Sequence, residues 1–385
     1  MGGCVSKGQV APEPTPAAAP GSPQPKPPPP PPLVPLAFGS HAHDGNQPGK
    51  KEKEQQDASF AQYINADLDD FDSSSKATAP VAFACGVFDG HGSGGREAAC
   101  AACTKVHSFL SHRPQALLDD PAAALAAAFA AADRSIGMSL DVDLCGTTAT
   151  VLAVVGHRLY VAWCGDSRAV MGSGPALSAV ALTRDHQGSD GAEAERVRRA
   201  GGRVRKRPGG AADAPLRVWA AEASGGPQAV GLMVTRSLGD RLMHEHAGVS
   251  SVPELAEREL HPGFDRLLVV GSDGLFDLET NEDVLLNAWS PFSRGGRPEE
   301  AAEAAVGSAL EKWRAQSGSD NVTAVVVRIA PDAAPLDRSP AAEAEAVRTD
   351  AGPSSRLDAA ADEEEEEDAP VEDLDGLLND ILTSP

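Results

Sequence analysis

The sequence lacks a long apolar run, has few cysteines, and carries too little positive charge to balance its negative charge. No apolar stretch approaches the ~18–20 residues that a membrane-spanning helix needs. Six cysteines in 385 residues show no disulfide-like spacing, and no secretory signal is present, so we expect reduced thiols in the cytosol. With 33 Lys and Arg against 56 Asp and Glu, the chain should repel phosphate backbones, which argues against nucleic-acid binding.

Both ends of the chain have too few apolar side chains to form a core. Thirteen of the 31 prolines lie between Pro12 and Pro35, and residues 331–385 hold 17 Asp and Glu but only three Arg. Neither composition offsets the entropy lost on ordering. We therefore predict a disordered proline-rich segment over 1–45, one globular domain over 46–330, and a disordered acidic tail over 331–385. The proline run would serve as a spacer or dock on aromatic grooves.

Cys100 and Cys103 form a single Cys-x-x-Cys pair on a stretch with helical patterning. A zinc site would need a second pair of ligands, and the sequence offers none. We interpret both cysteines as core residues.

The N-terminus carries a lipidation signal. Residues Met1 to Ser6 fit the Met-Gly-x-x-x-Ser pattern for myristoylation of Gly2, and Cys4 is a candidate for palmitoylation. Two acyl chains anchor a protein stably, whereas one binds reversibly. This interpretation places the protein on the cytoplasmic side of a membrane, the plasma membrane first, with a cytosolic pool. The alternative is a chance match in an unstructured leader.

Apolar runs and turn residues predict the elements of the middle region. Val81–Phe88 is typical of a buried strand, and residues 147–155 and 158–163 of a strand hairpin. Further strands are predicted at 267–271 and 322–329, and helices at 94–113, 121–138, 193–200, 281–289 and 299–316. Because the strands follow one another as hairpins rather than alternating with helices, we expect an α+β fold of antiparallel sheets covered by helices.

Aspartates recur at the ends of these predicted strands. Asp89 and Asp273 directly follow buried strands, Asp320 precedes the last one, and Asp166 lies between two strand-like runs. Such carboxylates contribute nothing to packing and are costly to bury. One Asp-Gly pair is usually a simple turn, and a lone histidine after it is usually a turn or surface residue. The set together predicts a cavity lined by oxygen atoms.

Metal-assisted hydrolysis is the chemistry that suits such a cavity. Mg²⁺ and Mn²⁺ prefer oxygen ligands and keep several waters, so a few carboxylates suffice. Two ions about 3.5–4 Å apart can activate a shared water for displacement at phosphorus. Asp89 is the candidate that bridges both ions, and His91 would protonate the leaving oxygen as general acid.

The ordered set of motifs resembles the metal-dependent protein phosphatases of the 2C class, of the plant and algal kind. The resemblance extends from about Gln55 to Ile329 and rests on these motifs: Val87–Gly92, Gly146–Ala149, Gly165–Ala169, Leu182–His186, Glu193–Val204, Thr235–Asp240, Gly248–Val249, Pro253–Glu254, Ser272–Asp277 and Gly318–Thr323.

The resemblance implies a central sandwich of two antiparallel β-sheets with helices on both outer faces and the metal site at one edge. It implies that Asp89 and the Gly90 carbonyl bind metal, that Asp273 and Asp320 complete the first ion's site, and that Asp57 is a ligand through water. Asp166 and Asp277 would hold a weaker third ion. It further implies direct attack by water on phosphoserine or phosphothreonine, without a phosphoenzyme, in a monomer.

One position departs from the family's pattern. The arginine expected five residues before Asp57, which would hold the substrate phosphate, is replaced by Glu52. Lys51 and Lys53 flank it, and Arg96 is a further basic candidate. A lysine lacks the bidentate fork of arginine, so phosphate capture would be weaker.

We expect a phosphatase that acts on phosphoproteins near a membrane. The alternatives are a membrane-tethered pseudophosphatase that serves as a scaffold, and a hydrolase of small phosphoesters. The loop between Val204 and Gln228 either contacts substrate or is a tolerated insertion. The apolar spacing within Val371–Leu382, next to the acidic run, would let the tail bind a partner or fold back on the enzyme; a solvated tail is the remaining alternative.

Overall fold

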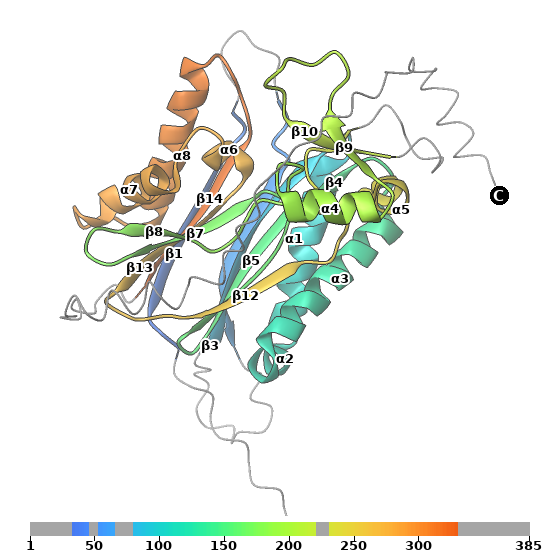
Figure 1. Ribbon diagram of the computed structural model, residues 1–385. Helices are drawn as coiled ribbons and strands as arrows, with labels where there is room; N and C mark the ends of the chain where they lie inside the picture. The colour runs from blue at the N-terminus through green and yellow to red at the C-terminus, as the bar shows by residue number, and fades with distance from the viewer. Residues whose placement is uncertain (1–32, 46–52, 66–79, 221–230, 330–385) are drawn as a thin grey trace, which may run out of the picture. The chain divides into compact units, whose positions relative to one another are not determined.

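Two antiparallel sheets packed face to face form the centre of the protein, and helices cover their outer faces (Figure 1). The computed structural model describes residues 33–45, 53–65, 80–220 and 231–329. Gly2, Cys4, the 331–385 tail and the helical pattern within Val371–Leu382 lie outside the described residues.

The strands and helices follow in this order. The strands are β1 (Leu36–His43), β2 (Asp57–Asn65), β3 (Pro80–His91), β4 (Gly146–Thr147), β5 (Ala149–Val155), β6 (Arg158–Cys164), β7 (Arg168–Ser173), β8 (Ser178–Ala181), β9 (Arg203–Lys206), β10 (Leu216–Trp219), β11 (Leu238–Gly239), β12 (Glu254–Glu259), β13 (Asp265–Gly271) and β14 (Val322–Ile329). The helices are α1 (Gly95–Ser111), α2 (Pro114–Asp119), α3 (Pro121–Ser139), α4 (Gly191–Arg199), α5 (Arg241–Ala247), α6 (Asp273–Phe276), α7 (Asn281–Phe292) and α8 (Pro298–Ala315).

Each sheet has a defined strand order. The smaller sheet runs β1-β14-β13-β7-β8, and the larger runs β11-β4-β3-β5-β6-β12, with β2 paired to β3. All of these pairings are antiparallel. A separate two-stranded ribbon consists of β9 and β10. The hairpin of β5 and β6 is the one that the sequence predicts.

The alternation of side chains along β3 explains why both faces of the larger sheet are buried. Phe83 and Val87 point into the core between the sheets, where they join Val325 and Val327 of β14. Ala84, on the opposite face, belongs to the core beneath the helices. Because successive strand residues face opposite sides, a continuously apolar strand is what a sheet covered on both faces requires.

Different helices cover the two outer faces. Helices α1, α2 and α3 pack on the larger sheet, and α6, α7 and α8 pack on the smaller one (Figure 1). The buried face of α1 includes Gly95 and three alanines, whose small side chains allow close approach to the sheet. Helix α3 begins at Pro121 after Asp120, whose side chain accepts a hydrogen bond from the Ala123 N–H. The predicted sandwich with helices on both outer faces is confirmed.

The predicted domain boundary at residue 46 is wrong. Residues 36–43 were expected to be disordered, yet they form β1, which pairs with β14 from Leu36 opposite Ile329 to His43 opposite Val322. The proline-rich composition hid this strand, whose own residues include no proline. Pairing with a distant strand, which composition does not report, orders it.

The cysteine pair divides between the two faces of α1. Cys103 is buried in the core, as predicted, whereas Cys100 is exposed, contrary to the prediction. The cysteines within the described ranges are free thiols. No helix in these ranges combines the length and the apolar character that crossing a bilayer would require.

A glycine in β1 provides a test of the corrected boundary. A Cβ on Gly39 would lie 2.4 Å from the Glu299 backbone nitrogen at the start of α8, so glycine is required for this close approach. We expect Gly39→Val to lower the free energy of unfolding by about 2 kcal/mol and the Tm by about 5 °C. Thermal denaturation followed by circular dichroism measures both.

Gly137→Ala is the matched control for Gly39→Val. Nothing lies within 4 Å of a Cβ at Gly137 in α3, and alanine favours helix, so the Tm should stay the same or rise slightly. An unchanged Tm in Gly39→Val would contradict the packing of β1 against α8.

Candidate active site

Strand ends from both sheets meet at one edge of the sandwich and bring acidic side chains together. In the larger sheet, Asp57 lies opposite Asp89 in the β2–β3 pair. In the smaller sheet, β13 ends at Gly271, and Ser272 and Asp273 follow it. The Ser272 hydroxyl donates a 2.8 Å hydrogen bond to Asp57 Oδ2 and so links the two sheets directly. The structure therefore gathers three of the predicted metal ligands.

Asp320 reaches the same edge through the loop that leads into β14. A Cβ on Gly274 would lie 2.0 Å from the Asn321 carbonyl oxygen and 3.3 Å from Asp320 Cβ, so the two loops approach closely only because residue 274 is glycine. The Gln56 N–H donates a 3.1 Å hydrogen bond to the Asn321 side-chain oxygen. These contacts hold Asp320 near the strand that carries Asp57.

Gly90, whose carbonyl was predicted to bind metal, lies in β3 directly after Asp89. It pairs with Thr147 of β4, and its N–H donates a 3.2 Å hydrogen bond to the Gln56 carbonyl. The Asp89 N–H donates to the Thr148 hydroxyl at 3.0 Å. The backbone around Asp89 is therefore fixed on both sides.

One basic side chain contacts this acidic group. The Lys53 ammonium contacts Asp320 Oδ1. Arg96 instead pairs with Glu54, with 3.5 Å between Nη1 and Oε1, and both side chains are exposed. Residues 51–52 lie outside the described ranges. Of the basic side chains weighed for phosphate capture, Lys53 is thus the one that contacts a predicted metal ligand.

Burial and the nearby Asp273 charge raise the pKa values of three acidic side chains at this edge. Burial raises the pKa of Asp57 to about 6, and the Asp273 carboxylate adds to the rise. Burial raises the pKa of Asp89 well above its usual range, with further contributions from Asp273 and Asp57. Burial also raises the pKa of Asp166 to about 7, again with Asp273 contributing. Several negative charges held this close are unfavourable unless protons or cations neutralise them.

Divalent cations suit this set of donors. Asp57 Oδ1 is buried, and within the described part of the chain no hydrogen bond of normal geometry reaches it. A set of carboxylates with a glycine carbonyl is the donor chemistry that Mg²⁺ and Mn²⁺ prefer. The described side chains of Asp, Glu, His and Cys nevertheless include no three already arranged around a single point as ligands. The residues fit the ions by chemistry and by charge.

The two residues predicted to hold a weaker third ion lie within electrostatic reach of Asp273. Asp166 is 5% exposed and accepts a 2.9 Å hydrogen bond from Gln187 Nε2. Partial burial raises the pKa of Asp277 to about 6, and Asp273 adds to the rise while Arg168 opposes it. The fold thus places both residues with the acidic group.

His91 is held by an acidic residue to which the sequence had assigned no role. His91 Nε2 lies 2.6 Å from Asp240 Oδ2, and the Ser237 hydroxyl donates to the same oxygen at 2.6 Å. Asp240 is 1% exposed and adopts a left-handed backbone with φ 45°, which is strained for a residue other than glycine. Burial lowers the pKa of His91, but the Asp240 charge and hydrogen bond outweigh it and raise the pKa overall.

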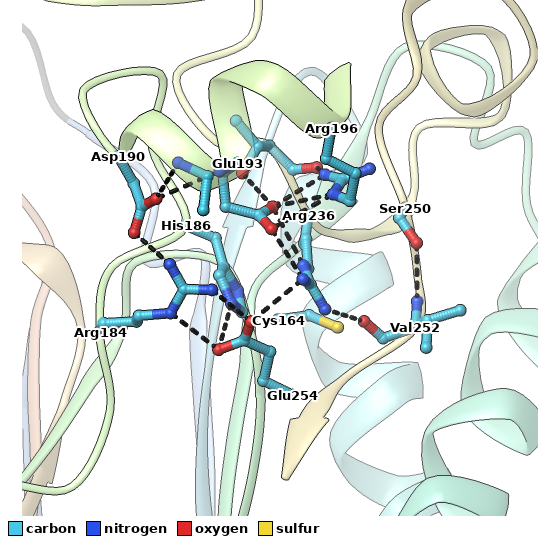
Figure 2. A network of polar contacts seen from close by, with 12 residues as sticks. Cys164, Arg184, His186, Asp190, Glu193, Arg196, Arg236, Ser250, Val252 and Glu254 are labelled. Atoms are coloured by element: carbon cyan, nitrogen blue, oxygen red, sulfur yellow. Dashed lines mark hydrogen bonds and ion pairs between the residues drawn. The ribbon is translucent and has the colours of Figure 1, made fainter. Parts of the chain in front are cut away.

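A network of ion pairs surrounds the start of α4 (Figure 2). Glu193 is 2% exposed and accepts hydrogen bonds from Arg196 Nη2 at 2.8 Å, Arg236 Nη2 at 2.7 Å and the Thr235 hydroxyl at 2.8 Å. Burial favours the neutral acid, but these bonds hold the pKa of Glu193 far below its usual range. Glu254 accepts from Arg236 at 3.2 Å. Thr235 is thereby fixed two residues before Ser237.

His186 lies in this network (Figure 2) and hydrogen-bonds the residue before Asp166. The Gly165 backbone N–H donates to the ring nitrogen Nδ1 of His186 at 3.1 Å. The backbone N–H of His186 in turn donates to the Gly165 carbonyl at 3.0 Å. The imidazole stacks on Trp163 with ring centroids 5.7 Å apart. Burial lowers the pKa of His186 to about 4, so the ring is neutral at physiological pH. The loop that carries Asp166 is fixed by this neutral ring.

Sequence reasoning located the acidic residues but not their supports. Asp240, Glu193 and His186 lie in motifs that had been noted only for their resemblance to a family. The available signal was their charge within motifs far apart in the sequence. Their partners, such as the 2.6 Å contact between His91 and Asp240, become apparent only in three dimensions.

Comparison with known proteins gives a consistent family. A family model described as Protein phosphatase 2C matches residues 53–318. The chain is 37% identical over 213 residues to Probable protein phosphatase 2C 12 of Oryza sativa subsp. japonica, which covers 54% of this chain and 51% of that protein. It is 34% identical over 253 residues to Probable protein phosphatase 2C 59 of Arabidopsis thaliana, with 65% of this chain and 70% of that protein covered. The match thus spans about half the length of the rice relative.

Solved structures share the fold. The serine-threonine phosphatase 2C from Toxoplasma gondii superimposes with a TM-score of 0.62 at 21% identity, covering 78% of this chain and 97% of that chain. A C. elegans sex determining protein superimposes with a TM-score of 0.58 at 24% identity, covering 78% of this chain and 66% of that chain. These similarities show the sandwich architecture.

The raised pKa of Asp166 predicts how stability depends on pH. A carboxyl whose folded pKa exceeds its unfolded value of about 4 binds protons in the folded state, so its contribution to stability is lost as pH rises toward the folded pKa of about 7. His186, with its pKa lowered to about 4, acts in the opposite direction below pH ~6.5. The comparison of a variant with the wild type isolates Asp166.

In EDTA, we expect Asp166→Asn to gain stability over the wild type progressively between pH 5.5 and 7.5, by about 2 kcal/mol at the upper end. Saturating Mn²⁺ should stabilise the wild type most at high pH, because it binds the ionised carboxylates. Urea denaturation at each pH measures both effects. Asp213→Asn, at an exposed position, is the control. A difference between Asp166→Asn and wild type that does not change with pH would refute the raised pKa.

Proposed function

The chain belongs to the protein phosphatase 2C family, and on this premise we propose that it hydrolyses phosphoserine and phosphothreonine in proteins. The observation that carries the proposal is the acidic edge, where the Asp273 carboxylate lies close enough to Asp57 and Asp89 to add to the rise in the pKa of both. An anionic phosphate would be repelled from such an edge without bound cations. The family depends on Mg²⁺ or Mn²⁺, which supports a metal-assisted reaction.

We propose that two ions, Mg²⁺ or Mn²⁺, bind at this edge. Their ligands would be Asp57 through water, Asp89 to both ions, the Gly90 carbonyl, Asp273 and Asp320. Asp166 and Asp277 would bind a weaker third ion. When bound, the ions would activate water for attack on phosphorus and neutralise the charge that develops on the phosphate.

The chain's own residues would carry out the proton transfer. As the bond between phosphorus and the serine or threonine oxygen breaks, that oxygen needs a proton. In the charged ring of His91, both nitrogens carry a proton. Nε2–H would donate to Asp240, and the proton on Nδ1 would pass to the leaving oxygen. Asp240 would orient the ring and stabilise its charged form. Its buried position and its second bond, from Ser237, keep it in place.

The metal dependence can be tested with one substitution. On a phosphothreonine peptide with Mn²⁺, we expect Asp89→Asn to lower kcat by at least ~10³-fold, and EDTA to abolish turnover of the wild type. In EDTA, Asp89→Asn should be as stable as the wild type or more stable, because the change removes repulsion within the acidic group. Phosphate release and thermal denaturation are the measurements.

Activity that survives EDTA or Asp89→Asn would refute the metal-assisted mechanism. Absence of turnover by the wild type, with Mn²⁺ shown by calorimetry to be bound, would instead support the scaffold alternative.

The role of Asp240 can be separated from a purely structural one by the choice of leaving group. For the phosphothreonine peptide, whose leaving oxygen needs a proton, we expect Asp240→Asn to lower kcat by about 10–100-fold. For p-nitrophenyl phosphate, whose leaving group departs without one, the loss should be several-fold smaller. Steady-state kinetics on both substrates measures the difference.

Asp143→Asn is the control for Asp240→Asn, because Asp143 accepts a 2.7 Å hydrogen bond from Arg241 at the start of the same helix, α5, but does not contact His91. Equal losses on both substrates would contradict the proton-transfer role.

A further inference from the structure

An exposed basic surface lies on α4 and β9 of a strongly acidic protein. Residues 196–217 hold eight Lys and Arg against a single Asp, a local net charge of +7 in a chain whose net charge is −23. Four of the basic residues are exposed: Arg198 and Arg199 on α4, Lys206 at the end of β9, and Arg207 directly after it. We call these four residues the basic face.

The fold uses other basic residues of this region internally, but the basic face contributes little to the fold. Arg196 Nη1 donates to the Gly248 carbonyl at 2.8 Å, and Arg217 Nη1 donates to the Gly231 carbonyl at 2.7 Å. On the basic face, Lys206 donates to the Ala212 carbonyl at 2.6 Å, a contact that leaves its charge unneutralised.

Arg199 pairs with Glu195 across one helical turn at 2.9 Å, but both side chains are exposed. Such a surface pair is worth well under ~1 kcal/mol. The basic face therefore retains its positive potential, and repulsion among its members would be relieved by an anionic partner.

The basic face has a rigid base close to the proposed site. Helix α4 begins at Gly191, four residues after Gln187, whose side chain hydrogen-bonds Asp166. Its first turn is held by Glu193, which binds Arg236 of a neighbouring loop (Figure 2). A ligand on the basic face would therefore lie on the helix whose start adjoins the support of Asp166.

The chain carries its own complementary segment. Residues 331–385 have a net charge of −14, and Asp362–Asp368 are seven consecutive acidic residues. Thirty-two residues separate Ile329, the last residue of β14, from Asp362. If these residues form the disordered tail that the composition predicts, a linker of that length spans about 30 Å on average and holds its end at an effective concentration on the order of millimolar. A separate acidic peptide would have to bind without that advantage.

We propose that the acidic run Asp362–Asp368 docks on the basic face of the same molecule. Charge complementarity and tethering favour this occupant over a separate acidic ligand. The docked tail would compete with acidic segments of phosphoprotein substrates. This consequence rests on the proposed function, whereas the docking itself does not.

The test measures docking on the full chain without using activity. Lys206 is acetylated with a limiting dose of an N-hydroxysuccinimide ester, and its rate of modification relative to Lys105 on α1 is read by mass spectrometry. At low salt, we expect neutralisation of the whole run, Asp362 and Asp368 to Asn and Glu363–Glu367 to Gln, to raise this ratio at least threefold. Sodium chloride at about 1 M, where the Debye length is ~3 Å, should remove the difference.

Two controls address net charge and location. Neutralising six scattered acids of the tail (Asp332, Asp337, Glu343, Glu345, Asp350 and Asp358) should raise the ratio by less than half as much. In the wild-type tail background, Arg198→Gln with Arg199→Gln should raise the ratio as the tail variant does. Arg113→Gln with Arg134→Gln, exposed on the other helical layer, should leave it unchanged.

Other occupants give different results, and each would overturn the proposal. If the modification rate of Lys206 relative to Lys105 is the same in wild type and tail variant at low salt, the tail does not cover the basic face. If that ratio is equal while Arg198→Gln with Arg199→Gln raises the KM for acidic phosphopeptides, the face binds substrate instead. Protection of Lys206 that rises with protein concentration indicates a second copy. Protection that appears only with phosphatidylserine vesicles indicates a membrane surface.

Discussion

Repulsion among buried carboxylates is the constraint around which this structure is organised. Asp57 and Asp89 come from the larger sheet and Asp273 from the end of a strand in the smaller one, and burial together with their shared charge raises the pKa values of Asp57 and Asp89. Left to itself, such an edge would open. The hydrogen bond from Ser272 to Asp57 ties one sheet to the other at this acidic edge. The sandwich core supplies the remaining stability that allows the acidic edge to persist.

The polar network around Glu193 also stabilises a buried carboxylate, but it does so with hydrogen bonds from cationic and hydroxyl side chains. Glu193 is buried, but two arginines and a threonine donate hydrogen bonds to its carboxylate, and these bonds lower its pKa. The pKa values of Asp57 and Asp89, in contrast, are raised. This contrast separates a supporting carboxylate from a reactive one. The support extends along the chain to Ser237 and to the strained Asp240, which holds His91. Strain at one backbone position is tolerated because the surrounding bonds determine it.

Negative and positive side chains are also grouped in separate regions of the protein. The acidic edge lies at the strand ends, and the basic face lies on α4 and β9; α4 begins four residues after Gln187, which hydrogen-bonds Asp166. The acidic edge attracts cations, and the basic face attracts anions. Because each charged region is held on its own elements of the fold, the chain would be able to bind a metal ion and an acidic segment at separate places.

The sequence alone predicted the antiparallel sandwich, most of its helices and strands, and the aspartates at the strand ends, because alternation, turn residues and strand-end position are local signals. It failed at β1, since a short strand next to a proline run is ordered only by pairing with β14, some 280 residues away. It also assigned no role to Asp240, because a pairing between positions 91 and 240 leaves no local trace. The acidic residues were thus determined by the sequence itself. Only the tertiary structure decided the repulsion among these carboxylates, the hydrogen bond from Ser272 to Asp57 and the pairing of His91 with Asp240. The reason is that electrostatics and hydrogen bonding depend on distances, which the tertiary structure sets.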